Sequence, residues 1–310
     1  MRRAIGAGIV AGVVALAILA TFLWPKPAPS AGVPRFGYID KTGAFVIPPQ
    51  FEFSWDFSEG LAAVRVNHKA GYINRNGELV IPAQFEEGGD FSEGFAPISI
   101  EGKIGYINRQ GMLVIPPQFD RGGIFSEGLA HVGMNGRYGY IDREGNMVIP
   151  TQFRDATPFA EGLAGVVRDH LCGYIDRQGR FVIPPQFESC GPFRDGVGLV
   201  QLNDLWGFID RSGSLVISPQ FEEADLLFEQ RIAVRVGNRW GFADPTGQVV
   251  VVPRFEKVRR FSEGLAPARI GGRFGYVDKA GALVIPPQFQ QAYPFHEGLA
   301  RVLANQENAP

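Results

Sequence analysis

The chain has 310 residues, with 30 Lys or Arg, 32 Asp or Glu and a formal net charge of −2. Its 40 Gly and 23 Pro stay below the share typical of low-complexity disorder, and a 45% hydrophobic content is enough to build a core. Collagen-like and disordered chains are therefore excluded. A dedicated nucleic-acid binder is also disfavoured, because no excess of cations is present to neutralise phosphates.

Residues 1–24 have the pattern of a membrane anchor or a signal sequence. Two arginines precede an uncharged apolar stretch over residues 4–24, which as a helix would be about 31 Å long and could cross a bilayer. The cations on its two sides orient the N-terminus toward the cytoplasm. We predict a single-pass inner-membrane anchor with the rest outside the cytoplasm, or a cleaved signal with the rest secreted or periplasmic. Both place the protein in the cell envelope.

A Pro-rich linker over residues 25–33 follows this segment and is expected to be stiff. Beyond the linker the chain is acidic, with 27 basic and 32 acidic residues, a net charge of −5. This charge argues against an anionic polymer or lipid surface as the main partner.

The rest of the chain repeats a unit of 34 residues. A glycine before an aromatic residue recurs at this interval, at Gly37, Gly71, Gly105, Gly139, Gly173, Gly207, Gly241 and Gly275. Eight units fill residues 34–308 without an insertion. One such unit cannot bury its own faces, so its stability must come from its neighbours.

Each unit is predicted to contain three short antiparallel strands. The first, as at 37–40, leads into a type I turn whose fourth residue is a structural glycine: Gly43, Gly77, Gly111, Gly145, Gly179, Gly213, Gly247 and Gly281. The second is an apolar run, as at 45–47, interpreted as buried on both faces and ended by prolines. The third, as at 62–66, alternates and is expected to bury one face.

The fold class is therefore all-β, a tandem array of eight three-stranded repeats plus the N-terminal helix. The array could be an open β-solenoid or superhelix, or it could close into a propeller-like ring. Propeller blades normally have four strands, so three strands per unit favour the open array. Unit six departs from the pattern over 227–231, through loop drift or because it carries a specific contact.

The sequence Trp-Gly-Phe-Ile-Asp at 206–210, followed by Gly213, an apolar run at 215–217 and Gln-Phe at 220–221, resembles the bacterial WG-repeat family. Trp240 begins a second match, and the other units hold Phe36, Ala70, Ile104, Tyr138, Cys172 and Phe274 at the Trp position. The resemblance implies a β-repeat module for binding or interaction, with no catalytic motif to transfer.

Two rows of charge are the first candidate binding features. The turns hold a basic row, Lys41, Arg75, Arg109, Arg143, Arg177, Arg211 and Lys279. The Ser-Glu-Gly turns hold an acidic row, Glu59, Glu93, Glu127, Glu161, Glu263 and Glu297, with Asp195 at the same position. They are either solvated turn residues that pair for little energy or a charged rail for a carboxylate-bearing ligand or a partner protein.

Other chemistry is sparse. Trp55, Trp206 and Trp240 are candidate aromatic contacts for a sugar. Turn capping explains the Asp and Asn of the turns, and no histidine spacing fits zinc, so neither metal nor cofactor is predicted. Two cysteines, Cys172 and Cys190, lie in or beside unit five, and their spacing leaves open whether they pair.

We therefore predict a membrane-tethered, extracytoplasmic protein-interaction scaffold that is not an enzyme, because equal repeats supply no unique catalytic cluster. Its expected partner is another envelope protein. The alternative is a carbohydrate- or cell-wall-binding module that uses aromatic clefts between hairpins. No nucleic acid is expected as a partner.

Overall fold

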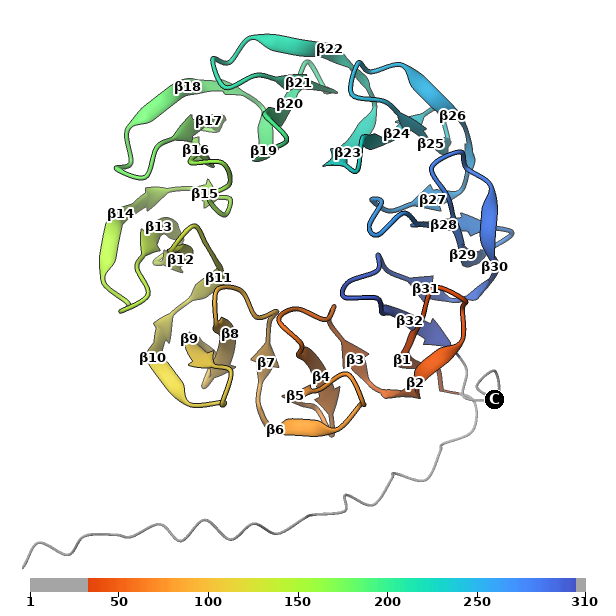
Figure 1. The fold of residues 1–310 in the computed structure, drawn as a ribbon. Coiled ribbons are helices and arrows are strands. Elements are labelled where there is room, and N and C mark those ends of the chain that lie inside the picture. The colour runs from red at the N-terminus through yellow and green to blue at the C-terminus, as the bar shows by residue number, and fades with distance from the viewer. Residues whose placement is uncertain (1–32, 305–310) are drawn as a thin grey trace, which may run out of the picture. The chain divides into compact units, whose positions relative to one another are not determined.

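In the computed structural model, residues 33–304 are described, and they form a closed ring of eight four-stranded antiparallel sheets (Figure 1). Each sheet is one blade, with one edge strand next to the central axis and its longest strand at the rim. The fold is an eight-bladed β-propeller. The prediction of an open solenoid of three-stranded units is wrong, and the closed ring is the arrangement found.

Blades are numbered here from the first complete sheet. Blade 1 consists of β3 (Phe53–Ser54), β4 (Ala62–Val66), β5 (Lys69–Ile73) and β6 (Leu79–Phe85), and blade 2 of β7 (Glu87–Gly88), β8 (Phe95–Ile100), β9 (Lys103–Asn108) and β10 (Leu113–Phe119). Blade 3 consists of β11 (Arg121–Ser126), β12 (Leu129–Met134), β13 (Arg137–Ile141) and β14 (Met147–Phe153), and blade 4 of β15 (Asp155–Ala156), β16 (Ala164–Arg168), β17 (Leu171–Ile175) and β18 (Phe181–Phe187).

Blade 5 consists of β19 (Ser189–Arg194), β20 (Val197–Leu202), β21 (Leu205–Ile209) and β22 (Leu215–Phe221), and blade 6 of β23 (Glu223–Phe228), β24 (Arg231–Val236), β25 (Arg239–Ala243) and β26 (Val249–Phe255). Blade 7 consists of β27 (Lys257–Val258), β28 (Ala266–Ile270), β29 (Arg273–Val277) and β30 (Leu283–Phe289), and blade 8 of β31 (Gln291–Ala292), β32 (Ala300–Ala304), β1 (Arg35–Ile39) and β2 (Phe45–Phe51).

The fourth strand of each blade comes from the segment between the second and third predicted strands. It is only two residues long in blades 1, 2, 4, 7 and 8, too short to show an alternating pattern. We call the residues from this strand to the following turn the inner segment, 53–57 in blade 1 and every 34 residues thereafter. The inner segments surround the axis of the ring (Figure 1).

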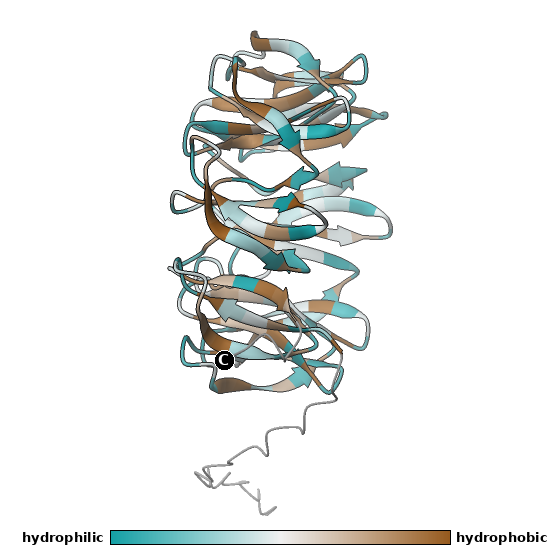
Figure 2. Ribbon diagram, turned by 90° about the vertical axis from the view of Figure 1, so that its right-hand side faces the viewer, coloured by the Kyte–Doolittle hydropathy of each residue, from teal (hydrophilic) through white to brown (hydrophobic). Residues whose placement is uncertain are grey.

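The second predicted strand lies at the rim and is not buried on both faces. In blade 8, Ile47 is buried, whereas Val46 beside it is 47% exposed, and the other blades repeat this contrast. Figure 2 shows hydrophobic and hydrophilic residues side by side on the rim strands. Pro48 and its counterparts lie in these edge strands, where a missing N–H donor discourages pairing with another chain.

Blade 8 closes the ring by combining both ends of the repeat region. β1 pairs with β32 in an uninterrupted antiparallel register from Arg35 opposite Ala304 to Ile39 opposite Ala300. Because the repeat boundary falls inside a blade, neither end has to supply a polar cap. This explains why the terminal units look like ordinary units in the sequence.

The hydrophobic core is divided among the spaces between neighbouring blades. At one such space, Tyr38 of blade 8 packs edge-on against Phe57 of blade 1, with ring centroids 4.8 Å apart. The Tyr38 hydroxyl donates a hydrogen bond of 2.8 Å to the Trp55 carbonyl. Burial raises the pKa of this phenol well above its usual value, so the hydroxyl stays a donor and fixes blade 8 to blade 1.

Residues 33–304 contain no helix long and apolar enough to cross a membrane. The described part of the chain therefore contains no single-pass anchor, and it gives no structural support to the cell-envelope localisation drawn from one. The N-terminal helix expected over 1–24, and the linker up to residue 32, lie outside the described residues.

Candidate functional site

The ring presents one framework eight times, so the positions that differ between blades identify where a specific ligand could be recognised. The position just before each acidic turn is the clearest case, because serine fills it in four blades and other residues in the rest: Ser58, Ser92, Ser126, Ala160, Arg194, Phe228, Ser262 and His296. Two residues earlier the sequence is again variable: Asp56, Asp90, Ile124, Pro158, Pro192, Leu226, Arg260 and Pro294. These residues lie at the ends of the inner segments, around the axis on one face of the ring, and we call this region the mouth.

Blades 8 and 1 meet at the mouth through an arginine that replaces a small residue. Arg301 on β32 corresponds to Ala63 in blade 1, and its Nε donates to Asp56 Oδ1 at 2.7 Å. Its Nη1 donates to the Ser54 carbonyl, and its guanidinium lies 3.6 Å from the centre of the Tyr293 ring. The arginine and its carboxylate are 12% and 17% exposed, which makes this a largely buried, well-satisfied ion pair.

Asp90 is the same aspartate one blade further on, but it lacks the arginine, because Ala63 stands where Arg301 would be. Its buried Oδ1 has no hydrogen-bond partner. Burial raises the pKa of Asp90 to about 7, the negative Asp56 adds to the rise, and Arg301 and Arg260 oppose it. The mouth thus holds a carboxyl group that exchanges its proton near neutral pH.

The other side of the mouth is basic. A pocket of about 320 Å³ opens there, lined by Arg194, Phe228, Arg260 and His296 from four consecutive blades. Burial lowers the pKa of His296 below its usual value, and the Asp56 carboxylate, 3.6 Å from Nε2, opposes this shift. Since arginine only donates, His296 Nε2 accepts from Arg260 Nη2 at 3.3 Å. The mouth therefore has an acidic arc at blades 1 and 2 and a basic arc at blades 5 to 7.

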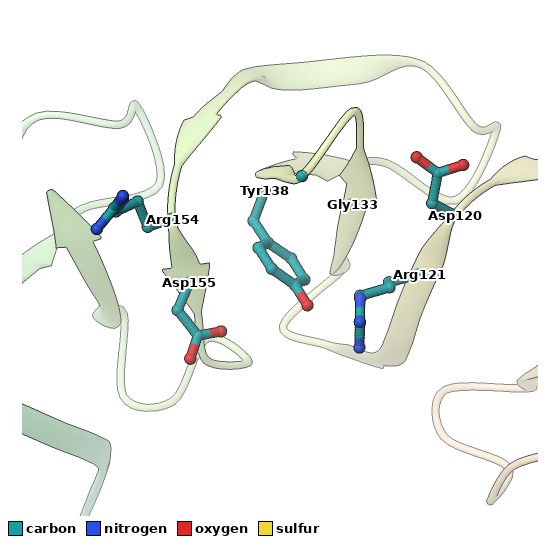
Figure 3. A pocket seen from close by; sticks show the side chains of 7 residues that line it. Asp120, Arg121, Gly133, Tyr138, Arg154 and Asp155 are labelled. Carbon is teal, nitrogen blue, oxygen red and sulfur yellow. The ribbon is translucent and has the colours of Figure 1, made fainter.

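A second pocket, of about 310 Å³, lies between blades 3 and 4 at the opposite end of the strands. Figure 3 shows Tyr138 between Arg121 and Asp155, with Asp120 and Arg154 further out on the two sides. Two of these charges already have partners: Asp120 accepts from Lys103 Nζ at 2.6 Å, and Arg154 lies 2.6 Å from His170 Nδ1. This pocket has balanced charge and one phenol, which makes it the weaker candidate.

The two predicted charged rows lie on the same face of the ring and meet each other there. Glu93 accepts a hydrogen bond from Gly128 N of the next blade at 2.9 Å, and Arg143 of that blade donates to the same carboxylate at 2.8 Å. Lys41 with Glu263, at 3.0 Å, is an equivalent ion pair. Such contacts join successive blades, and the cations keep about half of their side-chain surface exposed.

Within residues 33–304, seven of the eight acidic turns accept from the backbone of the following blade: Glu59, Glu93, Glu127, Glu161, Glu229, Glu263 and Glu297. Sequence reasoning missed Glu229, because the unusual residues around it hid the turn. The signal that could have identified Glu229 is its spacing of 34 residues from Glu263. At the remaining turn the shorter Asp195 makes no such bond in the structure.

Sequence reasoning also missed a second acidic row, on the face opposite the mouth. Glu52, Glu86, Asp120, Glu188, Glu222 and Glu256 each accept from the backbone of a hairpin between the second and third strands of a blade. The signal was an acid directly after the Gln-Phe or Arg-Phe pair of most units. These carboxylates fix hairpins and are not free for a ligand.

In the described part of the chain, no group of three or more His, Cys, Asp or Glu side chains could hold a metal ion. Cys172 and Cys190 are joined in a disulfide. The bond links β17 of blade 4 to β19 of blade 5 and so crosses a blade boundary.

Comparison with known proteins identifies the repeat. The model of the WG containing repeat matches eight times, at residues 36–69, 71–103, 104–138, 138–169, 173–206, 206–240, 240–274 and 274–306. The chain belongs to the WG-repeat family. No curated protein matches it.

Two solved structures share the ring architecture with this WG-repeat chain. One is described as the eukaryotic initiation factor, with 12% identity, a TM-score of 0.55, and coverage of 84% of this chain and 87% of the other. The second is dihydro-heme d1 dehydrogenase NirN in complex with DHE, with 13% identity, a TM-score of 0.54, and coverage of 87% and 78%. At these identities the likeness shows the fold alone.

The two letters of the WG motif have separate structural roles here. A Cβ on Gly207 would lie 2.5 Å from the Ile217 carbonyl oxygen and 2.7 Å from Pro219 N, because the rim strand passes directly over it. Trp206 is half-buried and packs with Leu226 of the next blade, and Trp240 packs in the following core. Trp55 lies instead in an inner segment, 4.5 Å from the Phe53 ring. The structure therefore does not bring the three predicted tryptophan contacts together.

Proposed function

We propose that this WG-repeat propeller is a non-catalytic protein-interaction domain that binds an extended segment of a partner protein at the mouth. The observation that carries the proposal is the contrast between a framework repeated eight times and the variable residues that surround the axis at the mouth. Eight equal blades need no such variation for folding. Ligand recognition accounts for this variation, because recognition of one ligand requires a surface that lacks the symmetry of the scaffold.

The composition of the mouth supports a protein partner. Trp55 and Tyr293, both half-buried, occupy equivalent places in neighbouring inner segments, and Arg259 lies 4.1 Å from the centre of the Tyr293 ring. Aromatic and arginine side chains are the residues that most often dominate the energy of protein interfaces. The carbohydrate alternative has less support, because Trp206 and Trp240 are packed in separate cores between blades.

A selection of random peptides displayed on phage, carried out on the immobilised full chain, tests this function. We expect enriched peptides that bind the wild type and lose most of their affinity for the Trp55→Gly and Tyr293→Gly variants. Both changes introduce the residue that Gly89, Gly123 and Gly191 already supply at the equivalent position, so the fold should tolerate them.

The matched control is Val114→Thr. Val114 is 42% exposed and lies on the rim strand of its blade, far from the mouth. It should leave peptide binding unchanged. If no peptide is enriched, or if enriched peptides bind the two mouth variants as well as the wild type, the proposed function is wrong.

A further inference from the structure

The basic arc of the mouth is built from residues that break the repeat. Arg194 and Phe228 occupy the position at which Ser58, Ser92, Ser126 and Ser262 stand in other blades. Arg260 occupies a position that holds aspartate, isoleucine, proline or leucine elsewhere. The scaffold does not need these three side chains, yet they converge on one pocket of about 320 Å³.

Both arginines are oriented by the same aromatic ring. The guanidinium carbon of Arg194 lies 4.1 Å from the centre of the Phe228 ring, and that of Arg260 lies 4.8 Å from it. Stacking of this kind uses the flat face of a guanidinium and leaves its N–H donors in the plane free. One of those donors on Arg260 is taken by His296.

Neither arginine has an acidic partner among residues 33–304. The one carboxylate in the lining, Glu229, is already engaged by Gly264 N at 3.0 Å and by Lys279 Nζ at 3.2 Å. Several other arginines of the ring form ion pairs, among them Arg143 and Arg235. The pocket therefore offers two fixed, unneutralised cations in a domain of net negative charge.

We propose that this pocket binds a carboxylate, supplied by an acidic side chain of the partner segment. The inference rests on the proposed function and specifies the chemistry of the segment. A carboxylate fits the donors of one or two guanidiniums, which match its geometry. A phosphate dianion is less suited, because the Asp56 carboxylate lies only 3.6 Å from His296 Nε2 at the edge of the pocket and the domain as a whole is acidic.

Calorimetric titration of the full chain with amidated hexaglutamate tests the inference, with hexaglutamine as the neutral probe and inorganic phosphate as the second anion. We expect hexaglutamate to bind, hexaglutamine to give no heat of binding, and phosphate to compete weakly or not at all. Arg194→Ser should weaken hexaglutamate binding at least about tenfold, since a charged donor is lost.

Arg194→Ser restores the serine of four other blades, so a folded variant is expected. The matched control is Arg180→Gln, which removes an arginine whose side chain is 75% exposed and paired with Asp176, and it should leave the affinity unchanged. Equal binding to wild type and Arg194→Ser, binding of phosphate in preference to hexaglutamate, or no binding of hexaglutamate would each overturn the inference.

The two proposals fail in different ways. Peptides that are selected on the wild type, depend on Trp55 and Tyr293, and bind Arg194→Ser normally would refute the carboxylate pocket and leave the interaction domain standing. Absence of any selected peptide would refute the interaction domain itself.

Discussion

At the scale of single residues, two neighbouring aspartates with the same place in the repeat have different chemistry. Asp56 is paired with Arg301, whereas Asp90 faces Ala63 and keeps an oxygen without a partner. The difference comes from one position on the adjacent strand. A repeat protein can in this way create a unique group without altering its backbone.

Asp90 should make stability depend on pH. Its pKa rises from an ordinary 3.8 to about 7 in the folded chain, so between about pH 4 and pH 7 the native state holds a proton that the unfolded state has lost. This contribution to stability is present below that window and is lost as the pH rises through it. The free energy of unfolding of Asp90→Asn should therefore exceed that of the wild type by more than about 1 kcal/mol at pH 8. At pH 4 the two free energies of unfolding should be nearly equal.

Urea unfolding of both proteins at several pH values measures this difference. A gap between Asp90→Asn and wild type that stays constant from pH 4 to pH 8 would show that the carboxyl group is not the cause.

The glycine of the motif should be intolerant of even one added methyl group. Gly207→Ala places a Cβ against the backbone of the rim strand, and we expect a loss of about 1–3 kcal/mol in the free energy of unfolding. Gly102→Asn is the comparison, because nothing lies within 4 Å of that site and asparagine accepts its positive φ of 70°. Equal melting temperatures of Gly207→Ala and Gly102→Asn would contradict this explanation of the motif.

At the scale of elements, the same type of turn contact joins each blade to the next, and one contact is missing. Asp195 is one methylene shorter than the glutamates at the other turns and makes no bond to Gln230 N of blade 6. Asp195→Glu should supply this bond and stabilise the ring by about 0.5–1.5 kcal/mol. Asp195→Asn keeps the short side chain and should give no gain, so equal melting temperatures for the two variants would argue against the contact.

The disulfide replaces the tryptophan contact at one blade boundary. Cys172 stands at the Trp position, Cys190 lies in the next inner strand, and 18 residues separate them. Loop closure of this size contributes about 3 kcal/mol in the chain-entropy model. A variant with alanine at both positions should melt at a lower temperature than the oxidised wild type, and only the wild type should respond to a reducing agent. Identical melting of oxidised and reduced wild type would exclude a stabilising role.

The period, the turns and the hairpins could be predicted from the sequence, because glycines such as Gly43 and strands such as 62–66 follow local rules. The inner strand could not, since two residues such as Phe53 and Ser54 carry no pattern. The burial of the rim strand was misjudged for a related reason. An apolar run does not reveal whether a neighbouring strand exists on its outer side, and Val46 has none.

Of the candidate site, the sequence predicted the charged rows and missed the mouth. Arg194 and Phe228 are departures from serine at one position of the repeat, and residues 227–231 depart from the pattern of the other units. Their convergence depends on the inner segments of neighbouring blades 5 to 8 lying side by side around a common axis. Spacing along the chain does not encode that proximity.

At the scale of the whole molecule, closure turns a one-dimensional repeat into a scaffold with an axis. Every blade then has two neighbours, and each hydrophobic core between blades is covered. The inner segments surround one axis, so the ring has a single mouth. All of this depends on β1 of the N-terminal end and β32 of the C-terminal end sharing blade 8.

The most direct test is a cross-link across that junction in the double variant Arg35→Cys and Ala304→Cys, whose positions are opposite each other in the register. Directly opposed residues of antiparallel strands have Cα atoms about 4.5–5.5 Å apart, within the range that a disulfide spans. Peptide mass mapping of the oxidised monomer should find the two introduced thiols joined within one chain, in addition to the native bond between Cys172 and Cys190. Introduced thiols that stay free, or that link only separate chains, would contradict the closed ring.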